Sequence, residues 1–126
     1  MSRLLVDTNV IFWMLVSDRR RLTDAARDAL ASERNAIYVS AISVFEIAVK
    51  RSLGRLEIGS GWARSLPAIG LEPLPATALH AEAVEQLPWH HRDPFDRLLV
   101  AQAKVEEMAL VSADRRLGAY DVEVIW

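Results

Sequence analysis

The sequence predicts an α/β protein: a three-layer α/β/α sandwich around a central, mostly parallel sheet of four to five strands. Short apolar runs alternate with longer helical segments, a pattern typical of parallel strands joined by helices on both faces of a sheet. The chain has 126 residues, 52% of them hydrophobic and 25% charged, which fits a globular protein with an ordinary core. We see no repeat, linker or low-complexity tract, and we therefore expect one domain over residues 1–126.

The expected elements in the first half of the chain are a strand over 4–6, helices over 11–16 and 23–32, a strand over 36–39, a helix over 41–53 and a short helix over 62–66. The run Leu4-Leu5-Val6 is apolar throughout, as in a strand buried on both faces. Asp7, Thr8 or Asn9 can cap the helix that follows, and Thr23 can cap the next one. Residues 36–39 are largely β-branched or aromatic, which favours a strand. Gly54 ends the helix expected over 41–53.

The second half predicts an extended segment over 70–75, helices over 77–87 and 94–108, a strand over 109–111, a short helix over 114–117 and a strand over 122–126. Pro73 and Pro75 keep the extended segment out of the helical region and place it near the edge of the sheet. Asp93-Pro94 is a strong helix start, because Asp caps well and Pro suits the first helical position. The loop before it, Pro88 to Arg92, is rich in Trp and His.

Composition excludes several classes of protein. Cysteine is absent, which removes disulfides and thiolate metal sites. No apolar stretch is long enough to cross a bilayer, and no signal peptide is visible at the start, which is compatible with a cytoplasmic protein. The net charge of -2 lacks the strongly basic signature of many nucleic-acid binders. Nearly all basic residues are Arg, which suits phosphate contact or reflects the codon usage of a GC-rich genome.

Four acidic residues carry the functional prediction: Asp7, Glu46, Asp96 and Asp114. Asp7 and Asp114 lie near the ends of strands, and the other two lie on helices that begin near the same edge of the sheet. Ligands of open α/β sheets bind at the carboxyl ends of the strands. Carboxylates brought together there repel one another by roughly 4 kcal/mol per close pair. A hard divalent cation offsets this repulsion, so the pattern predicts a metal-dependent enzyme acting on phosphate esters.

Each acid also has a structural explanation. Asp7 is a candidate N-cap, and Glu46 fits a capping box with Ser43 as well as an i, i+4 ion pair with Lys50. An apolar helix surrounds Glu46, however, and a partly buried carboxylate needs a partner such as Lys50 or a cation.

The later acids have similar alternatives. Asp93 is assigned mainly to the helix start, whereas Asp96 lies on the apolar side of that helix, facing the core or crevice. Arg115 and Arg116 can neutralise Asp114. A ligand role is not favoured for His90 or His91, because the two lack helical metal-ligand spacing and lie in a polar loop.

Four segments of the sequence resemble the PIN-domain ribonucleases, and in particular the VapC-type toxins of bacterial toxin–antitoxin pairs. They are Leu5-Val6-Asp7-Thr8-Asn9, Ser43-Val44-Phe45-Glu46-Ile47 with Lys50, the run from His91 to Ala103 that contains Asp93-Pro94-Phe95-Asp96-Arg97, and Ser112-Ala113-Asp114. The likeness runs in order over essentially the whole chain. The segment around Asp96 is quite specific, whereas the first segment alone is weak.

The resemblance implies a PIN-like fold and a toxin that cleaves RNA endonucleolytically with Mg²⁺ or Mn²⁺. It implies Asp7, Glu46, Asp96 and Asp114 as metal-binding and catalytic acids, with Thr8, Asp93 and Ser112 lining the site. Water would be the nucleophile, leaving a 5′-phosphate and a 3′-hydroxyl. The implied partners are an RNA substrate, a small VapB-like antitoxin and a second copy in a homodimer. Arg97, Arg115 and Arg116 are candidates for phosphate contacts because they neighbour the acids.

Two rival readings remain at this point. A receiver-like signalling domain also has acids at strand ends, but it would need a second acid beside Asp7 and a Lys near the last strand, and the sequence has neither. A non-catalytic RNA-binding domain is the other rival. The four intact carboxylates argue against it.

Overall fold

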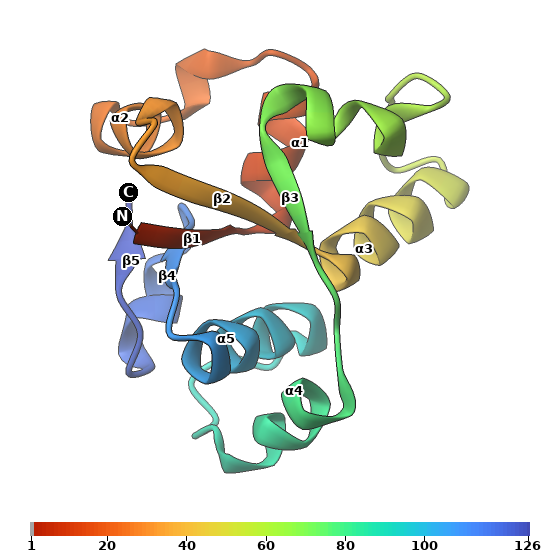
Figure 1. Cartoon of the computed structure of the whole chain (residues 1–126). Coiled ribbons are helices and arrows are strands. Elements are labelled where there is room, and N and C mark those ends of the chain that lie inside the picture. Colours follow the sequence, from red (N-terminus) through yellow and green to blue (C-terminus); the bar gives the residue numbers. More distant parts are fainter. Residues whose placement is uncertain (1) are drawn as a thin grey trace.

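The computed structural model describes residues 2–126 and contains one five-stranded sheet in the order β3-β2-β1-β4-β5 (Figure 1). All neighbouring strands are parallel. The strands are β1 (Ser2–Val6), β2 (Asn35–Ser40), β3 (Leu71–Leu74), β4 (Ala109–Val111) and β5 (Val124–Ile125). The predicted fold class is confirmed. The extended segment that contains the prolines forms the edge strand β3, where a proline without an N–H is tolerated because one side of the strand has no neighbouring strand to bond.

The five α-helices are α1 (Thr8–Leu15), α2 (Asp24–Ala31), α3 (Ala41–Ser52), α4 (Ala78–Ala83) and α5 (Pro94–Glu106). Helix α1 begins three residues earlier than expected, because the Asp7 side chain accepts a hydrogen bond from the Val10 amide and caps the helix directly after β1. The helix expected over 77–87 divides into α4 and a 3₁₀ turn at Val84–Gln86. No helix within residues 2–126 is both long and apolar enough to cross a membrane.

Two hydrophobic cores cover the two faces of the sheet, as alternation along β1 requires. Leu4 and Val6 point into one core, which α1, α2 and α3 complete with residues such as Ile11, Ala26 and Ile47. Leu5 points into the other core, which is filled mainly from α5. Figure 1 shows the same division, with α1 and α2 on one side of the strands and α4 and α5 on the other. The three-layer sandwich follows from this arrangement.

The strand register brings the functional segments to one edge. Val6, the last residue of β1, lies opposite Val39 of β2 and Val111 of β4. The residues directly after these strands, including Asp7 and Ser112, therefore meet at the carboxyl edge of the sheet. This is the edge at which open α/β sheets bind their ligands.

Candidate metal centre

Asp7 is held at the centre of the site by two hydrogen bonds. Its Oδ1 accepts from the Val10 amide at 3.0 Å, and its Oδ2 accepts from the Ser112 hydroxyl. The side chain is buried, and burial raises the pKa of Asp7 to about 6, against the lowering effect of these hydrogen bonds. The N-cap role and the site role expected for Asp7 are therefore compatible, because one oxygen caps α1 and the other bonds Ser112 at the carboxyl edge of the sheet.

Glu46 is the second buried acid, and both of its oxygens have a partner. Oε1 accepts from the Thr8 hydroxyl at 2.6 Å, and Oε2 lies 2.9 Å from Lys50 Nζ. The Thr8 hydroxyl is also 3.0 Å from Ser43 Oγ. Lys50 is the partner that the sequence suggested for this buried acid. The capping box is wrong, because Ser40 caps α3 and Ser43 lies inside the helix.

Asp93 and Asp96 have different tasks at the start of α5. Asp93 caps the helix, since its Oδ1 accepts from the amides of Phe95 at 2.8 Å and Asp96 at 3.1 Å. Asp96 lies in the first turn and is half-buried. Burial and the neighbouring charge of Asp93 raise the pKa of Asp96 to about 6.

Asp114 follows β4 and caps the short helix Arg115–Ala119. Arg116 binds its carboxylate in a fork, with Nε 3.0 Å from Oδ1 and NH2 3.0 Å from Oδ2. These hydrogen bonds from Arg116 lower the pKa of Asp114 to about 2. Asp114 therefore stays ionised at neutral pH, which is the form that can bind a cation.

His91 joins the acids, although the sequence did not favour it. Its Nε2 lies 3.2 Å from Asp96 Oδ2 and 3.1 Å from Asp114 Oδ2. Within residues 2–126, these are the only three His, Asp or Glu side chains whose possible metal-binding atoms all lie within 4.8 Å of one another. His90 is exposed and packs edge-on against Tyr120. The signal that points to His91 is its place two residues before the Asp93 helix start, which brings the loop to the site.

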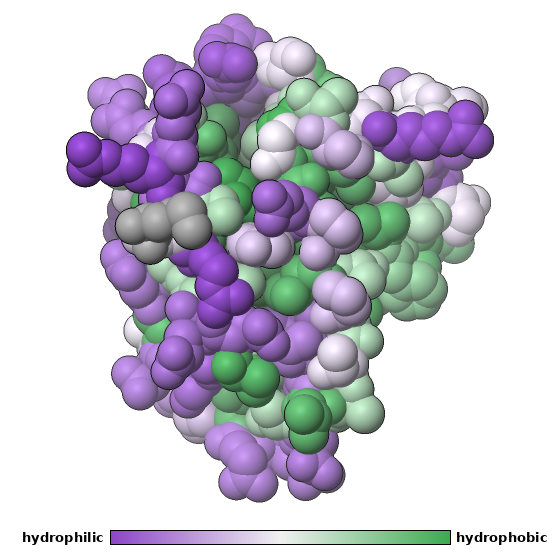
Figure 2. All heavy atoms as spheres, viewed as in Figure 1, coloured by the Kyte–Doolittle hydropathy of each residue, from purple (hydrophilic) through white to green (hydrophobic). Residues whose placement is uncertain are grey.

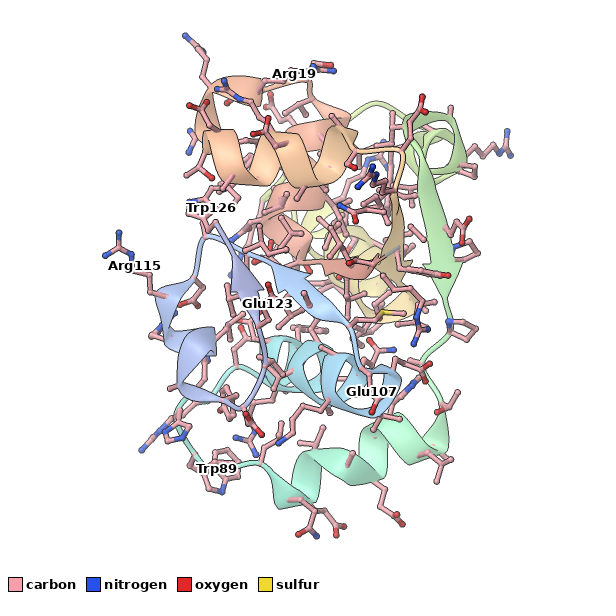
Figure 3. The ribbon with its side chains drawn as sticks, turned by 60° about the vertical axis from the view of Figure 1, so that its left-hand side comes forward. Arg19, Trp89, Glu107, Arg115, Glu123 and Trp126 are labelled. Atoms are coloured by element: carbon pink, nitrogen blue, oxygen red, sulfur yellow. The ribbon has the colours of Figure 1, made fainter. Side chains whose placement is uncertain are left out.

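The three arginines expected to contact phosphate lie in different environments. Arg115 is exposed and extends from its turn away from the ribbon (Figure 3), and Arg116 is occupied by Asp114. Arg97 requires a correction, because it is buried with only 3% of its surface exposed. Its guanidinium lies 3.8 Å from the centre of the Trp89 ring and donates to the Tyr120 hydroxyl and to the backbone carbonyls of Val84, Leu87, Pro88 and His91. Its donors bind the protein's own backbone and are unavailable to a phosphate.

The four predicted acids share one electrostatic environment. The charges of Asp114 and Glu46 raise the pKa of Asp7, and those of Glu46 and Asp7 raise the pKa of Asp96. Lys50 and Arg116 are the only Lys or Arg side chains that form ion pairs with these four carboxylates within the part of the chain that is described, and His91 lies between Asp96 and Asp114. The carboxylate oxygens of these acids are hard ligands, and their negative charge exceeds the positive charge of their partners. A divalent cation such as Mg²⁺ prefers ligands of this kind. The residues present therefore fit a divalent metal ion.

Fold and site together define a class of protein. The family model of the PIN domain matches residues 4–123, and the chain belongs to the PIN-domain family. It is 31% identical over 127 residues to Ribonuclease VapC22 of Mycobacterium tuberculosis, an alignment that covers 95% of this chain and 93% of that protein.

Solved structures with the same fold come from several organisms. One is VapBC2 of Rickettsia felis bound to a DNA fragment from its promoter, with a TM-score of 0.71, 15% identity and coverage of 97% of this chain and 96% of that one. Another is a toxin–antitoxin complex from Klebsiella pneumoniae, with a TM-score of 0.64, 18% identity and coverage of 98% and 96%. At these identities the likeness establishes the fold.

Proposed function

We propose that this protein is a metal-dependent endoribonuclease and the toxin of a toxin–antitoxin pair. The observation that carries the proposal is the convergence of Asp7, Glu46, Asp96 and Asp114 at the carboxyl edge of the sheet, with too few cationic partners for their charge. Membership of the PIN family and the likeness to a ribonuclease named VapC22 support the same reaction class.

Asp7, Asp96 and Asp114 would hold the cation, which we propose is Mg²⁺ or Mn²⁺. The bound ion would activate water and stabilise charge on the phosphodiester during its hydrolysis. Cleavage by water would leave a 5′-phosphate and a 3′-hydroxyl.

The protein's own contribution is to fix the directions of these acids. Ser112 and the Val10 amide orient Asp7, and the helix cap at Asp93 orients the first turn that carries Asp96. Glu46 is restrained at one oxygen by Thr8 and at the other by Lys50. We assign Glu46 to orienting the attacking water, because an acid restrained at both oxygens keeps a constant direction.

Arg115 and Arg116 are the remaining candidates for phosphate contact. Arg115 follows Asp114 in the sequence, is free of ion pairs within the described residues, and extends away from the ribbon (Figure 3). Arg116 lies against Asp114, and a cation that takes over the charge of Asp114 would release this guanidinium toward a substrate phosphate.

The proposed partners are RNA, a VapB-like antitoxin and a second copy of the chain, all meeting in the cytoplasm. Similar folds occur in a VapBC2 complex and in another toxin–antitoxin complex. The surface in Figure 2 carries apolar areas between its polar side chains, and large apolar residues are exposed on several elements, such as Phe45 at 56% on α3 and Leu79 at 71% on α4. An Arg of the antitoxin that pairs with the four carboxylates would explain how the antitoxin inhibits the toxin. Replacing such an Arg by Ala should weaken inhibition, and unchanged inhibition would refute this mechanism.

The receiver-like alternative does not fit the topology. Receiver sheets have the strand order 2-1-3-4-5, whereas this sheet has the order β3-β2-β1-β4-β5. The non-catalytic RNA-binding alternative is decided by experiment.

The test is cleavage of a mixed RNA pool by antitoxin-free protein with Mg²⁺, with Mn²⁺ and with EDTA. Asp7→Asn and Asp96→Asn should each lower the cleavage rate by at least about a hundredfold, because residues that merely support metal ligands already cost about 10- to 100-fold. Asp28→Asn is the matched control, an exposed acid on α2 without an ion pair in the described chain, and should leave the rate unchanged. Absence of cleavage by the folded wild type, together with RNA binding, would support the non-catalytic alternative instead.

A further inference from the structure

The ring of His91 is held in one orientation by a backbone donor. The Asp93 amide donates to Nδ1 of His91 at 3.1 Å. In a neutral imidazole, one nitrogen carries the proton and the other accepts. Because Nδ1 is the acceptor here, the proton of His91 lies on Nε2.

This tautomer determines what His91 offers to the site. Nε2 faces Asp96 Oδ2 at 3.2 Å and Asp114 Oδ2 at 3.1 Å, so its N–H is shared between two carboxylates. A metal ion at Nε2 would need the lone pair of that nitrogen and would move the proton to Nδ1. Two donors, Nδ1–H and the Asp93 N–H, would then point at each other, and a hydrogen bond at a buried site would be lost.

The backbone of His91 is fixed as firmly as its ring. Its amide donates to the Tyr120 hydroxyl at 3.0 Å. Arg97 donates to the same hydroxyl at 3.2 Å and to the His91 carbonyl at 3.4 Å. The main chain that carries the imidazole is therefore fixed, and the ring is held on it by the Asp93 amide at Nδ1 and the two carboxylates at Nε2.

We propose that His91 is a positioning residue that donates from Nε2 to Asp96 and Asp114 and does not coordinate the cation. The spacing of His91, Asp96 and Asp114 suggests a three-ligand metal site, but the hydrogen bond at Nδ1 makes the histidine a donor to two ligands. Carboxylates that bind metals are commonly oriented by such donors. The inference rests on the proposed function, since it concerns the same cation.

His80 supplies an internal reference for the test. Its Nδ1 accepts from the Thr77 amide at 3.1 Å, and its Nε2 faces Glu106 Oε2 at 2.9 Å. The same reasoning assigns the Nε2–H tautomer to His80, but His80 belongs to the cap of α4 and contacts none of the four predicted acids. A cation should therefore leave the signals of His80 unchanged.

The first measurement is the ¹⁵N spectrum of histidine-labelled, ion-free protein at one pH, repeated with saturating Mg²⁺. The sequence has three histidines, so the signals can be assigned from His91→Gln and His90→Ala. We expect His91 and His80 to show the Nε2–H tautomer without the ion, and His91 to keep it when Mg²⁺ is bound. A proton on Nδ1 of His91, before or after Mg²⁺ is added, would overturn the proposal.

The second measurement is Mg²⁺ and Mn²⁺ affinity by calorimetry. His91→Ala removes the donor and should weaken binding about 10-fold or more, whereas His91→Gln places an amide N–H near the position of Nε2 and should stay within about threefold of the wild type. His90→Ala, at the exposed neighbour, is the matched control. Equal losses in His91→Gln and His91→Ala would overturn the donor role. Failure of the wild type to bind either ion would instead refute the proposed function, while the ion-free spectrum would still decide the tautomer.

Discussion

Two buried polar clusters of this protein differ in their balance of charge. We call Asp7, Glu46, Asp96 and Asp114 the acidic centre, and Ser40, His80, Gln102 and Glu106 the Gln102 network. In the Gln102 network, Gln102 accepts from Ser40 at 2.5 Å and donates to the Pro75 carbonyl at 3.3 Å, and the only acid, Glu106, pairs with His80 and Arg3.

In the acidic centre, too, every fully buried side-chain polar atom has a hydrogen-bond partner within the described residues. The acidic centre nevertheless keeps two acids whose pKa is raised to about 6. Hydrogen bonding alone therefore does not make buried polar groups stabilising. The Gln102 network should hold the fold together, whereas the acidic centre should lower the stability of the ion-free protein in return for binding a cation.

The largest expected effect is a gain in stability when the acidic centre loses charge. In EDTA at pH 7.5, the double variant Asp7→Asn/Asp96→Asn should be more stable to urea than the wild type by several kcal/mol. Each pKa rises from 3.8 to about 6, and a shift of about two units corresponds to about 3 kcal/mol as an upper bound. Asn also keeps the capping ability of Asp7.

The pH dependence of this gain follows from the sign of the shifts. A raised carboxyl pKa means that the folded protein keeps its proton longer than the unfolded chain. Wild-type stability from these two groups is therefore complete below about pH 3.8 and is lost as the pH rises through about 6. The difference between variant and wild type should vanish near pH 3.5. A difference that persists there would show that charge is not its cause.

The cation should narrow the difference in stability between the two proteins. At a Mg²⁺ concentration of about 100 times the dissociation constant, a ligand that binds only the folded state stabilises it by about 2.7 kcal/mol. The wild type should gain this amount in thermal or urea unfolding, and the double variant should gain almost nothing. Equal gains in both proteins would place the Mg²⁺ site away from the acidic centre.

The Gln102 network should respond to the loss of a polar group in the opposite direction. Gln102 is fully buried, and Gln102→Leu would leave the Pro75 carbonyl and the Ser40 hydroxyl without this partner. We expect urea unfolding to show a loss of about 2 kcal/mol, with RNA cleavage by the folded variant near the wild-type rate. A large loss of cleavage at unchanged stability would mean that the network serves the reaction.

The smallest effect should come from the exposed rim of the acidic centre. Arg116 holds the pKa of Asp114 at about 2, so the stability that this pair supplies is present above about pH 3.8 and is lost as the pH falls toward 2. Arg116→Ala should move this acid transition to higher pH, which circular dichroism between pH 2 and 4 can follow. Arg115→Ala is the control and should leave the transition in place.

The fold was predictable from the sequence because its signals are local. Leu4-Leu5-Val6 is apolar at every position and became a strand buried on both faces, and Asp93-Pro94 marked the first residue of α5. The boundaries were less predictable, since Asp7, Thr8 and Asn9 were all candidate caps and α1 begins three residues before the predicted start.

The positions of the candidate site residues were predictable only where a side chain's surroundings follow from its own element. The structure brings Asp7, Glu46, Asp96 and Asp114 to one edge because strand ends and helix starts meet there. The roles of Arg97 and His91 depend on contacts across the fold, with the 84–91 segment and with Asp114 respectively. A neighbouring charge in the sequence gives no indication of such contacts.

The burial of Arg97 has a consequence for how this protein tolerates mutation. The guanidinium of Arg97 binds four backbone carbonyls of the segment that ends at His91. Arg97 is also the residue next to Asp96 in α5. Lysine keeps the charge but not the fork of donors. In a library of all substitutions scored for folded yield, position 97 should therefore behave like a core position and accept almost nothing but arginine, although a surface role would have left it open to many residues.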